Sequence, residues 1–243
     1  MVGGIRFEHS HRLVAGTVGF LTLILTVWIE MTETRKRVRW LAIACLGAVV
    51  LQGILGGLTV LFRLPAPISV AHACLGPIFF CLTVCLAMLL KVRTPSNLEI
   101  VPELETEELK RFRLHSTLTA LSIFFQMLLG SVVRHTGGDV WIHVLWAFVV
   151  LMMTGSLVTR AANHFGEDRQ IFRPALFLGF LVVAEFFLGI GAFVSTRIAG
   201  IQPGLTQVLF PTVHQTLGAL ILATSVVLTL RPSSKQLAST VSA

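Results

Sequence analysis

Residues 69–90 read Ser-Val-Ala-His-Ala-Cys-Leu-Gly-Pro-Ile-Phe-Phe-Cys-Leu-Thr-Val-Cys-Leu-Ala-Met-Leu-Leu, a run with no charged side chain and a single histidine, His72. A helix of about 20 apolar residues is long enough to cross the hydrocarbon core of a bilayer. Gly76 follows His72 by four positions and therefore lies on the same face of the helix. The stretch predicts a transmembrane helix that carries an imidazole near its start.

Similar apolar stretches recur along the whole chain. Its 243 residues are 54% hydrophobic and only 13% charged, whereas a soluble domain carries roughly 25% charged residues. The mean hydropathy is +0.83. We expect seven spans, near residues 11–30, 40–62, 69–90, 114–133, 140–159, 174–195 and 205–230. The predicted fold class is an all-α integral membrane protein with seven transmembrane helices.

Lysine and arginine are distributed unevenly between the two ends of these spans. One set of connections and the tail hold most of them: Arg35, Lys36, Arg37, Arg39, Lys91, Arg93, Lys110, Arg111, Arg113, Arg160, Arg169, Arg173, Arg231 and Lys235. The opposite end has only Arg6, Arg12, Arg63, Arg134 and Arg197. Because the positive end faces the cytoplasm, we expect a multi-pass protein of the cell (inner) membrane with a cytoplasmic C-terminus. The net charge of +7 follows from this topology, so no nucleic-acid partner is predicted.

The chain divides at an acidic connection and its two parts look repeated. We expect an N-terminal bundle of three helices over 1–90, a cytoplasmic linker over 91–113, a four-helix bundle over 114–230 and a cytoplasmic tail over 231–243. Gln52-Gly-Ile-Leu-Gly-Gly57, Gln126-Met-Leu-Leu-Gly-Ser131 and Glu185-Phe-Phe-Leu-Gly-Ile190 share one pattern. The polar residues of this pattern should face the bundle interior, as packing hydrogen bonds or as groups behind a ligand. A carboxylate inside a membrane is costly, so a partner is expected for Glu185.

Four histidines, His11, His72, His143 and His214, stand near the starts of alternate spans. Each has a small residue four positions later, namely Ala15, Gly76, Ala147 and Gly218. Neutral imidazoles from facing helices can hold a heme iron from both sides, and a bare patch on the helix lets a flat macrocycle lie close. The pattern predicts two hemes at the outer membrane face. The alternative is that these histidines are polar residues that form hydrogen bonds within the bundle.

Charged residues accompany the histidines at the same face. Glu8 precedes His11 by three residues and could act as an acid, a base or a charge stabiliser beside a bound substrate. It could equally pair with Arg12 or cap the helix. Arg12 and Arg134 could bind heme propionates or extend to the membrane interface, and the sequence leaves these alternatives open.

Several of these stretches resemble the heme A synthase family. They are Arg6-Phe-Glu-His-Ser-His-Arg-Leu-Val-Ala-Gly16, Leu55-Gly-Gly-Leu-Thr59, Ile68-Ser-Val-Ala-His-Ala-Cys-Leu-Gly76, Val133-Arg-His-Thr-Gly137, and His214 with Gly218. The resemblance covers nearly the whole chain. It implies two similar four-helix bundles. Because this sequence has no span before residue 1, it would supply three helices of the first bundle and all four of the second.

The resemblance also implies a function and a set of site residues. The family oxidises the C8 methyl of heme O to a formyl group, which yields heme A for terminal oxidases. By this resemblance, His11 and His72 would hold the substrate heme, His143 and His214 would ligate a heme b cofactor, and Glu8 would be the catalytic carboxylate. The implied partners are heme O delivered by a heme O synthase, an electron donor, cytochrome oxidase assembly factors and the lipid membrane.

Two functions of other classes remain alongside a heme-dependent oxidoreductase. One is a non-enzymatic membrane electron carrier with two b-type hemes, each held by two histidines. The other is an oxidase-assembly protein that binds heme O and releases it unchanged. The sequence also leaves open whether the protein forms a homo-oligomer.

Overall fold

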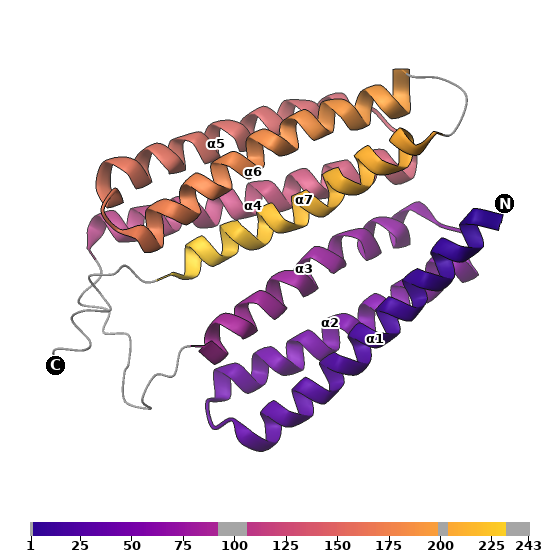
Figure 1. Ribbon diagram of the computed structural model, residues 1–243, viewed down its shortest axis with the longest axis horizontal. Coiled ribbons are helices and arrows are strands. Elements are labelled where there is room, and N and C mark those ends of the chain that lie inside the picture. Colours follow the sequence, from indigo (N-terminus) through magenta and orange to yellow (C-terminus); the bar gives the residue numbers. More distant parts are fainter. Residues whose placement is uncertain (1, 92–105, 199–203, 232–243) are drawn as a thin grey trace. The chain divides into compact units, whose positions relative to one another are not determined.

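The computed structural model describes residues 2–91, 106–198 and 204–231, with side chains from residue 8 onward. The described helices are α1 (Val2–Thr32), α2 (Lys36–Leu61), α3 (Ala66–Lys91), α4 (Glu107–Thr136), α5 (Trp141–Phe165), α6 (Arg169–Phe193), the short π-helix η2 (Val194–Ile198) and α7 (Leu205–Leu230) (Figure 1). Seven of these helices, with α6 extended by η2, are long and apolar enough to cross a membrane. The predicted all-α membrane fold is confirmed.

The helices extend beyond the apolar segments from which they were predicted. α4 begins at Glu107 rather than near residue 114, inside the predicted linker 91–113. Thr106 caps this helix by accepting a hydrogen bond from the Leu109 amide at 3.3 Å, and Glu107 and Glu108 favour its N-terminal dipole. Hydropathy reports the part of a helix that meets lipid, whereas polar caps decide where it ends. Residues 92–105 of the predicted linker and 232–243 of the tail lie outside the described residues.

The chain forms two compact units, residues 1–96 and 97–243. In the first unit, which we call the N-unit, α2 packs against both α1 and α3. Its buried core lies where α1 turns into α2 and consists of Ile29, Val38, Ala42, Cys45 and Leu86. The Thr26 hydroxyl lies 3.2 Å from the Ala42 carbonyl across the α1–α2 contact.

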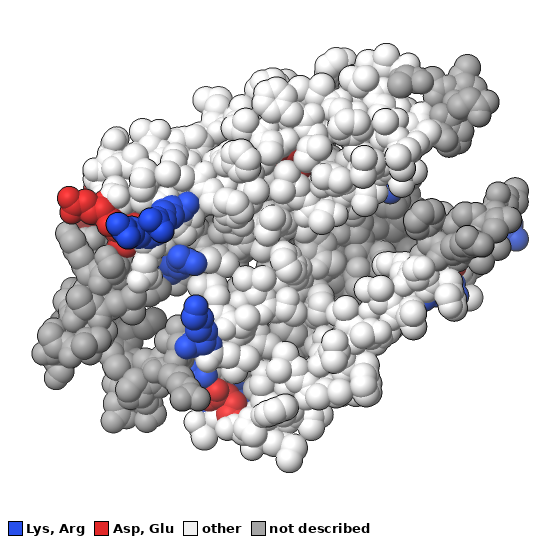
Figure 2. Space-filling view, viewed as in Figure 1, with Lys and Arg blue, Asp and Glu red and all other residues white. Residues whose placement is uncertain are grey.

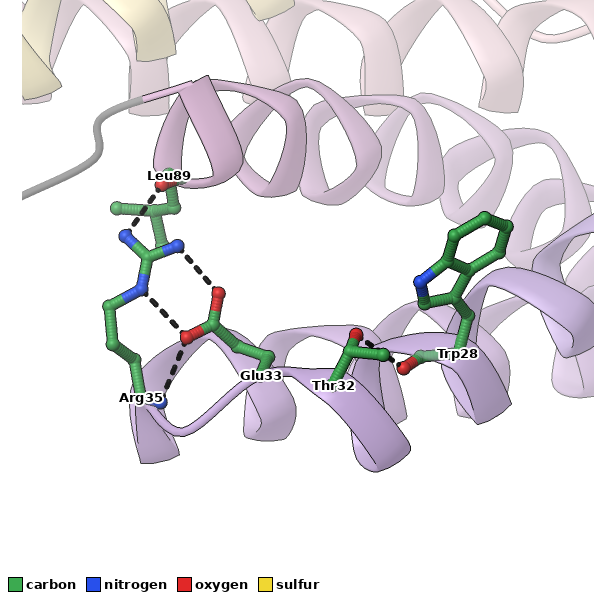
Figure 3. A network of polar contacts seen from close by, with 5 residues as sticks. All are labelled: Trp28, Thr32, Glu33, Arg35 and Leu89. Carbon is green, nitrogen blue, oxygen red and sulfur yellow. Dashed lines mark hydrogen bonds and ion pairs between the residues drawn. The ribbon is translucent and has the colours of Figure 1, made fainter.

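A polar contact closes the same end of the N-unit (Figure 3). The Arg35 guanidinium binds both carboxylate oxygens of Glu33, at 2.9 and 2.6 Å, and donates to the Leu89 carbonyl of α3 at 3.0 Å. The side-chain hydrogen bond to Arg35 is the main reason that the pKa of Glu33 falls to about 2. One arginine thus connects the α1–α2 turn to the end of α3.

The second unit, the C-unit, is a closed four-helix bundle. α4 and α6 each pack against both α5 and α7, so each helix has two neighbours. Its buried core combines large apolar side chains, such as Phe112, Leu157 and Leu178, with buried hydroxyl residues, such as Ser116 and Thr119. Small hydroxyl residues let transmembrane helices approach closely, and they satisfy themselves on their own helix backbone. Thr119, for example, donates to the His115 carbonyl at 2.9 Å.

The surface of each unit fits a lipid environment. Large apolar side chains are exposed along the helices of both units, with Trp28 of α1 66% and Phe180 of α6 68% exposed. On the face drawn in Figure 2, Lys and Arg gather near helix ends and the surface between them is largely uncharged. Exposed apolar surface of this extent is favourable in a bilayer and unfavourable in water. The protein is therefore an integral membrane protein.

Candidate functional site

The four predicted histidines fall into two pairs, one in each unit. His11 on α1 and His72 on α3 belong to the N-unit, whereas His143 on α5 and His214 on α7 belong to the C-unit. His11 is exposed and the other three are partly buried. The two pairs differ in how the surrounding helices hold them.

In the C-unit the rings of His143 and His214 face each other across the bundle. Their centroids are 6.3 Å apart and their planes are inclined by 88°. An imidazole nitrogen binds a metal at about 2.0 Å, so two imidazoles on opposite sides of one metal have centroids about 6 Å apart. The observed separation fits two axial ligands that share one iron.

Three of the four imidazoles pack against a glycine of the preceding helix. A Cβ atom added to Gly56, Gly130 or Gly189 would lie 3.0, 2.9 or 3.2 Å from the Cε1 atom of His72, His143 or His214, respectively. Each of these glycines is the Leu-Gly glycine of the repeated pattern found in the sequence. Glycines often allow helices to pack closely in membranes, and at these three positions the group that they admit is the imidazole ring.

The polar residue one turn before each glycine reaches the same histidine. Gln52 and Gln126 donate their amides to the backbone carbonyls of His72 and His143, both at 3.0 Å. Glu185 instead places its Oε1 atom 3.1 Å from Nδ1 of His214. The interior partner that was expected for Glu185 is therefore His214, which is itself one of the predicted heme ligands.

These contacts leave imidazole nitrogens available in both units. Nδ1 of His72 hydrogen bonds to the Gln52 carbonyl at 3.2 Å, so its Nε2 atom is free to bind a metal. Because Glu185 lies beside Nδ1 of His214, the Nε2 atom of His214 is likewise free to bind a metal. Nδ1 of His143 has no hydrogen-bond partner among the described residues. Metal-binding histidines typically direct their second nitrogen to a carbonyl or carboxylate. His72 does so by a hydrogen bond, whereas Nδ1 of His214 lies 3.1 Å from the Glu185 carboxylate without hydrogen-bond geometry.

Two of the small residues that follow a histidine by four positions, Gly76 and Gly218, lie beside the polar residue of the preceding helix. A Cβ atom on Gly76 would lie 3.4 Å from Nε2 of Gln52, and one on Gly218 would lie 3.1 Å from Oε1 of Glu185. At these two positions the missing side chain makes room for the polar residue of the preceding helix. That these positions also let a macrocycle lie close stays a prediction.

The charged residues of the N-unit lie at its surface. Arg12 donates to Oε1 of Glu8 at 2.7 Å, one helical turn away, and both side chains are more than half exposed. Of the two open readings of Glu8, the structure contains the ion pair with Arg12. Arg134, near the end of α4, is exposed.

The described residues contain no group of three or more His, Cys, Asp or Glu side chains arranged to hold a metal ion. A heme does not need such a group, because its macrocycle supplies the in-plane ligands and the protein supplies only the axial ones. The pair His143–His214 fits that requirement in distance and in available nitrogens. The geometry thus defines a membrane helical bundle in which two histidines of opposite helices lie at a distance that suits one shared metal.

Comparison with known proteins places the chain in a family. Residues 5–140 match the COX15-CtaA family, described as cytochrome oxidase assembly protein. Since this match covers more than half of the chain, the protein belongs to that family.

Curated relatives are similar along much of the chain at low identity. A heme A synthase of Bacillus pumilus (strain SAFR-032) is 22% identical over 215 residues, which cover 75% of this chain and 67% of the relative. A heme A synthase of Geobacillus kaustophilus (strain HTA426) is 23% identical over 209 residues, with 75% and 64% covered. One of Shouchella clausii (strain KSM-K16) is 28% identical over 134 residues, with 53% and 42% covered. No solved structure gives a significant match.

Proposed function

We propose that this chain is a heme A synthase, an oxidoreductase that converts the C8 methyl of heme O to a formyl group. The observation that carries the proposal is the pair of facing imidazoles in a chain of the cytochrome oxidase assembly family. The curated relatives named heme A synthase support the same activity. The chain spans about two thirds or less of these relatives' own length, so the activity of the whole relatives is a proposal for this chain.

In this proposal the two units have different tasks. His143 and His214 of the C-unit would hold a resident heme b, and His11 and His72 of the N-unit would hold heme O as substrate. The resident heme would supply electrons from an external donor to the substrate site, where dioxygen would be the oxidant that hydroxylates the methyl twice before water is lost to leave the formyl group. Gln126 and Glu185 would fix the C-unit ligands, and Gln52 would fix His72, each by the contacts described above.

Glu8 is the proposed catalytic carboxylate of the N-unit. It lies on α1 one turn before His11, where Arg12 holds it by a hydrogen bond of 2.7 Å. From this position it could take up or release a proton during oxidation of the substrate methyl. Arg12 and Arg134 remain candidates for the propionates, because arginine pairs well with carboxylates.

The proposed topology follows from the same charge asymmetry that the sequence shows. The turn Glu33–Arg35 and the start of α4 would face the cytoplasm, since lysine and arginine are concentrated there. The four histidines would then lie toward the outer face of the inner membrane. Heme O synthase, an electron donor and oxidase assembly factors are the partners that this role requires.

The direct test is to extract the hemes from membranes that contain this chain and a source of heme O, and to identify them by mass spectrometry. We expect heme A from the wild type, and heme O without heme A from Glu8→Gln with protein level and heme b unchanged. Heme b together with unconverted heme O in the wild type would favour an electron carrier. Bound heme O that is released unchanged, without heme b, would favour an assembly protein.

A further inference from the structure

Glu185 is an unusual residue in this membrane protein. Among the described helices it is the one carboxylate that lies more than two turns from either helix end. A carboxylate at such a depth is unfavourable unless a partner compensates it. Its Oε1 atom lies 3.1 Å from Nδ1 of His214, a contact at ion-pair distance without hydrogen-bond geometry, and its other oxygen is buried without a partner among the described residues.

The surroundings of Glu185 are built to keep this contact. Gly189, one turn later on α6, admits the His214 ring, since a Cβ there would lie 3.2 Å from Cε1. Gly218, one turn after His214 on α7, admits the carboxylate, since a Cβ there would lie 3.1 Å from Oε1. Two glycines on two helices therefore shape one space for the ring and the carboxylate together.

The other two repeats use glutamine in a different way. The amides of Gln52 and Gln126 donate to backbone carbonyls of the histidine helices. Gln126 also approaches the ring of its histidine, with its amide nitrogen 3.4 Å from Nε2 of His143. Glu185 differs from both glutamines because its Oε1 atom lies beside the other ring nitrogen, Nδ1 of His214, at 3.1 Å.

We propose that Glu185 is the positioning residue of the C-unit heme, and that it makes His214 a stronger axial donor than His143. This inference rests on the proposed binding of a heme between these two histidines. A carboxylate that accepts from Nδ1 fixes the ring, directs Nε2 toward the iron and increases the electron density of the ligand. A stronger donor favours the oxidised iron, so the heme gives up its electron more readily to the next acceptor.

The test compares the full-length protein with Glu185→Gln and Glu185→Ala after loading with hemin. The measurements are bound heme per protein, the absorption spectrum and the midpoint potential. Glutamine keeps an acceptor oxygen and the size of the side chain, so we expect Glu185→Gln to retain heme with a higher midpoint potential. Glu185→Ala removes the contact. We expect its heme affinity to fall about 10–100-fold, as is usual when a residue that contacts a metal ligand is removed.

A second variant alters the contact between Glu185 and His214 without changing either residue. Gly218→Ala should push the carboxylate away from the ring and raise the midpoint potential in the same direction as Glu185→Gln. Gly155→Ala on α5, where a Cβ would meet nothing within 4 Å, is the matched control and should leave the potential unchanged.

The possible failures are distinguishable. A wild-type protein that binds no hemin, or one that keeps the same heme spectrum without His214, would overturn the proposed heme site. A wild type that binds heme through both histidines, with an unchanged midpoint potential in both Glu185→Gln and Gly218→Ala, would overturn only the role of Glu185.

Discussion

The N-unit and the C-unit carry the same histidine motif, but the contacts that hold the imidazole occur twice in the C-unit and once in the N-unit. In the C-unit, α4 and α6 each offer a glycine to an imidazole and a polar side chain to the same histidine helix. In the N-unit only α2 does so, for His72, and His11 on α1 is exposed. The difference teaches that a histidine in these bundles is placed by the helix that precedes it. For His72, His143 and His214 the described residues include that helix, and the ring is packed against its glycine.

The largest expected effect is the loss of the C-unit heme when one of its ligands is removed. We expect His214→Ala or His143→Ala to remove the part of the bis-histidine heme absorption that belongs to the proposed C-unit heme, because a single imidazole leaves one axial position open. Removing His72 should leave this absorption in place, since His72 belongs to the other unit. Difference spectra of the purified variants measure both outcomes.

His164→Ala is a suitable control, because His164 is exposed near the end of α5. It should not change the spectrum. Loss of the C-unit signal in the His72 variant as well would show that the two units do not bind heme separately, and the comparison drawn above would fail.

The next effect tests the glycines that admit the imidazoles. Gly130→Ala and Gly56→Ala each bring a Cβ to about van der Waals overlap with a ring, at 2.9 and 3.0 Å from Cε1. Overpacking of this kind costs about 1–3 kcal/mol, so we expect lower thermal stability and, for Gly130→Ala, weaker heme binding.

Gly57 is the neighbour of Gly56 and provides a matched control within the same turn. A Cβ at Gly57 meets nothing within 4 Å, and alanine is favoured over glycine in helices by up to about 1 kcal/mol. Gly57→Ala should therefore be neutral or stabilising in a thermal unfolding assay in detergent. Equal destabilisation at both positions would mean that helix packing in general, rather than the ring of His72, requires the glycine.

The sequence was a good guide to the helices and to the residues that repeat. Seven apolar segments predicted the seven spans, because the bilayer demands a long apolar run whatever the neighbours are. The repeated polar residue and glycine were also visible, since residues four apart lie on one face. Gln52, Gln126 and Glu185 were expected to face the interior, and they do.

The sequence could not show which neighbour fills the space beside a glycine. Gly76 and Gly218 were predicted to leave room for a macrocycle, whereas Gln52 and Glu185 lie closest to them. Choosing between those neighbours requires the rotation of two helices about their axes, which depends on packing across the bundle. The extension of α4 to Glu107 was missed because a hydropathy pattern does not register polar caps.

The smallest expected effect concerns the Glu33–Arg35 contact that closes the N-unit. The pKa of Glu33 is about 2 in the folded protein against 4.5 for the free side chain. A lowered pKa means that the contact stabilises the fold fully above pH 4.5, and that this contribution disappears as the pH falls toward 2. We expect Glu33→Gln to lower the unfolding temperature slightly at pH 6, and the difference from the wild type to shrink at pH 3.

The corresponding exposed ion pair of the C-unit sharpens the comparison. Glu107 has one contact with Arg111, at 3.3 Å between side chains that are more than 60% exposed, whereas Glu33 has two side-chain contacts and a backbone amide from Arg35. Exposed single pairs contribute little to stability, so Glu107→Gln should have no measurable effect at either pH. If Glu107→Gln and Glu33→Gln behaved alike, the Glu33–Arg35 contact would contribute no more to stability than an exposed ion pair.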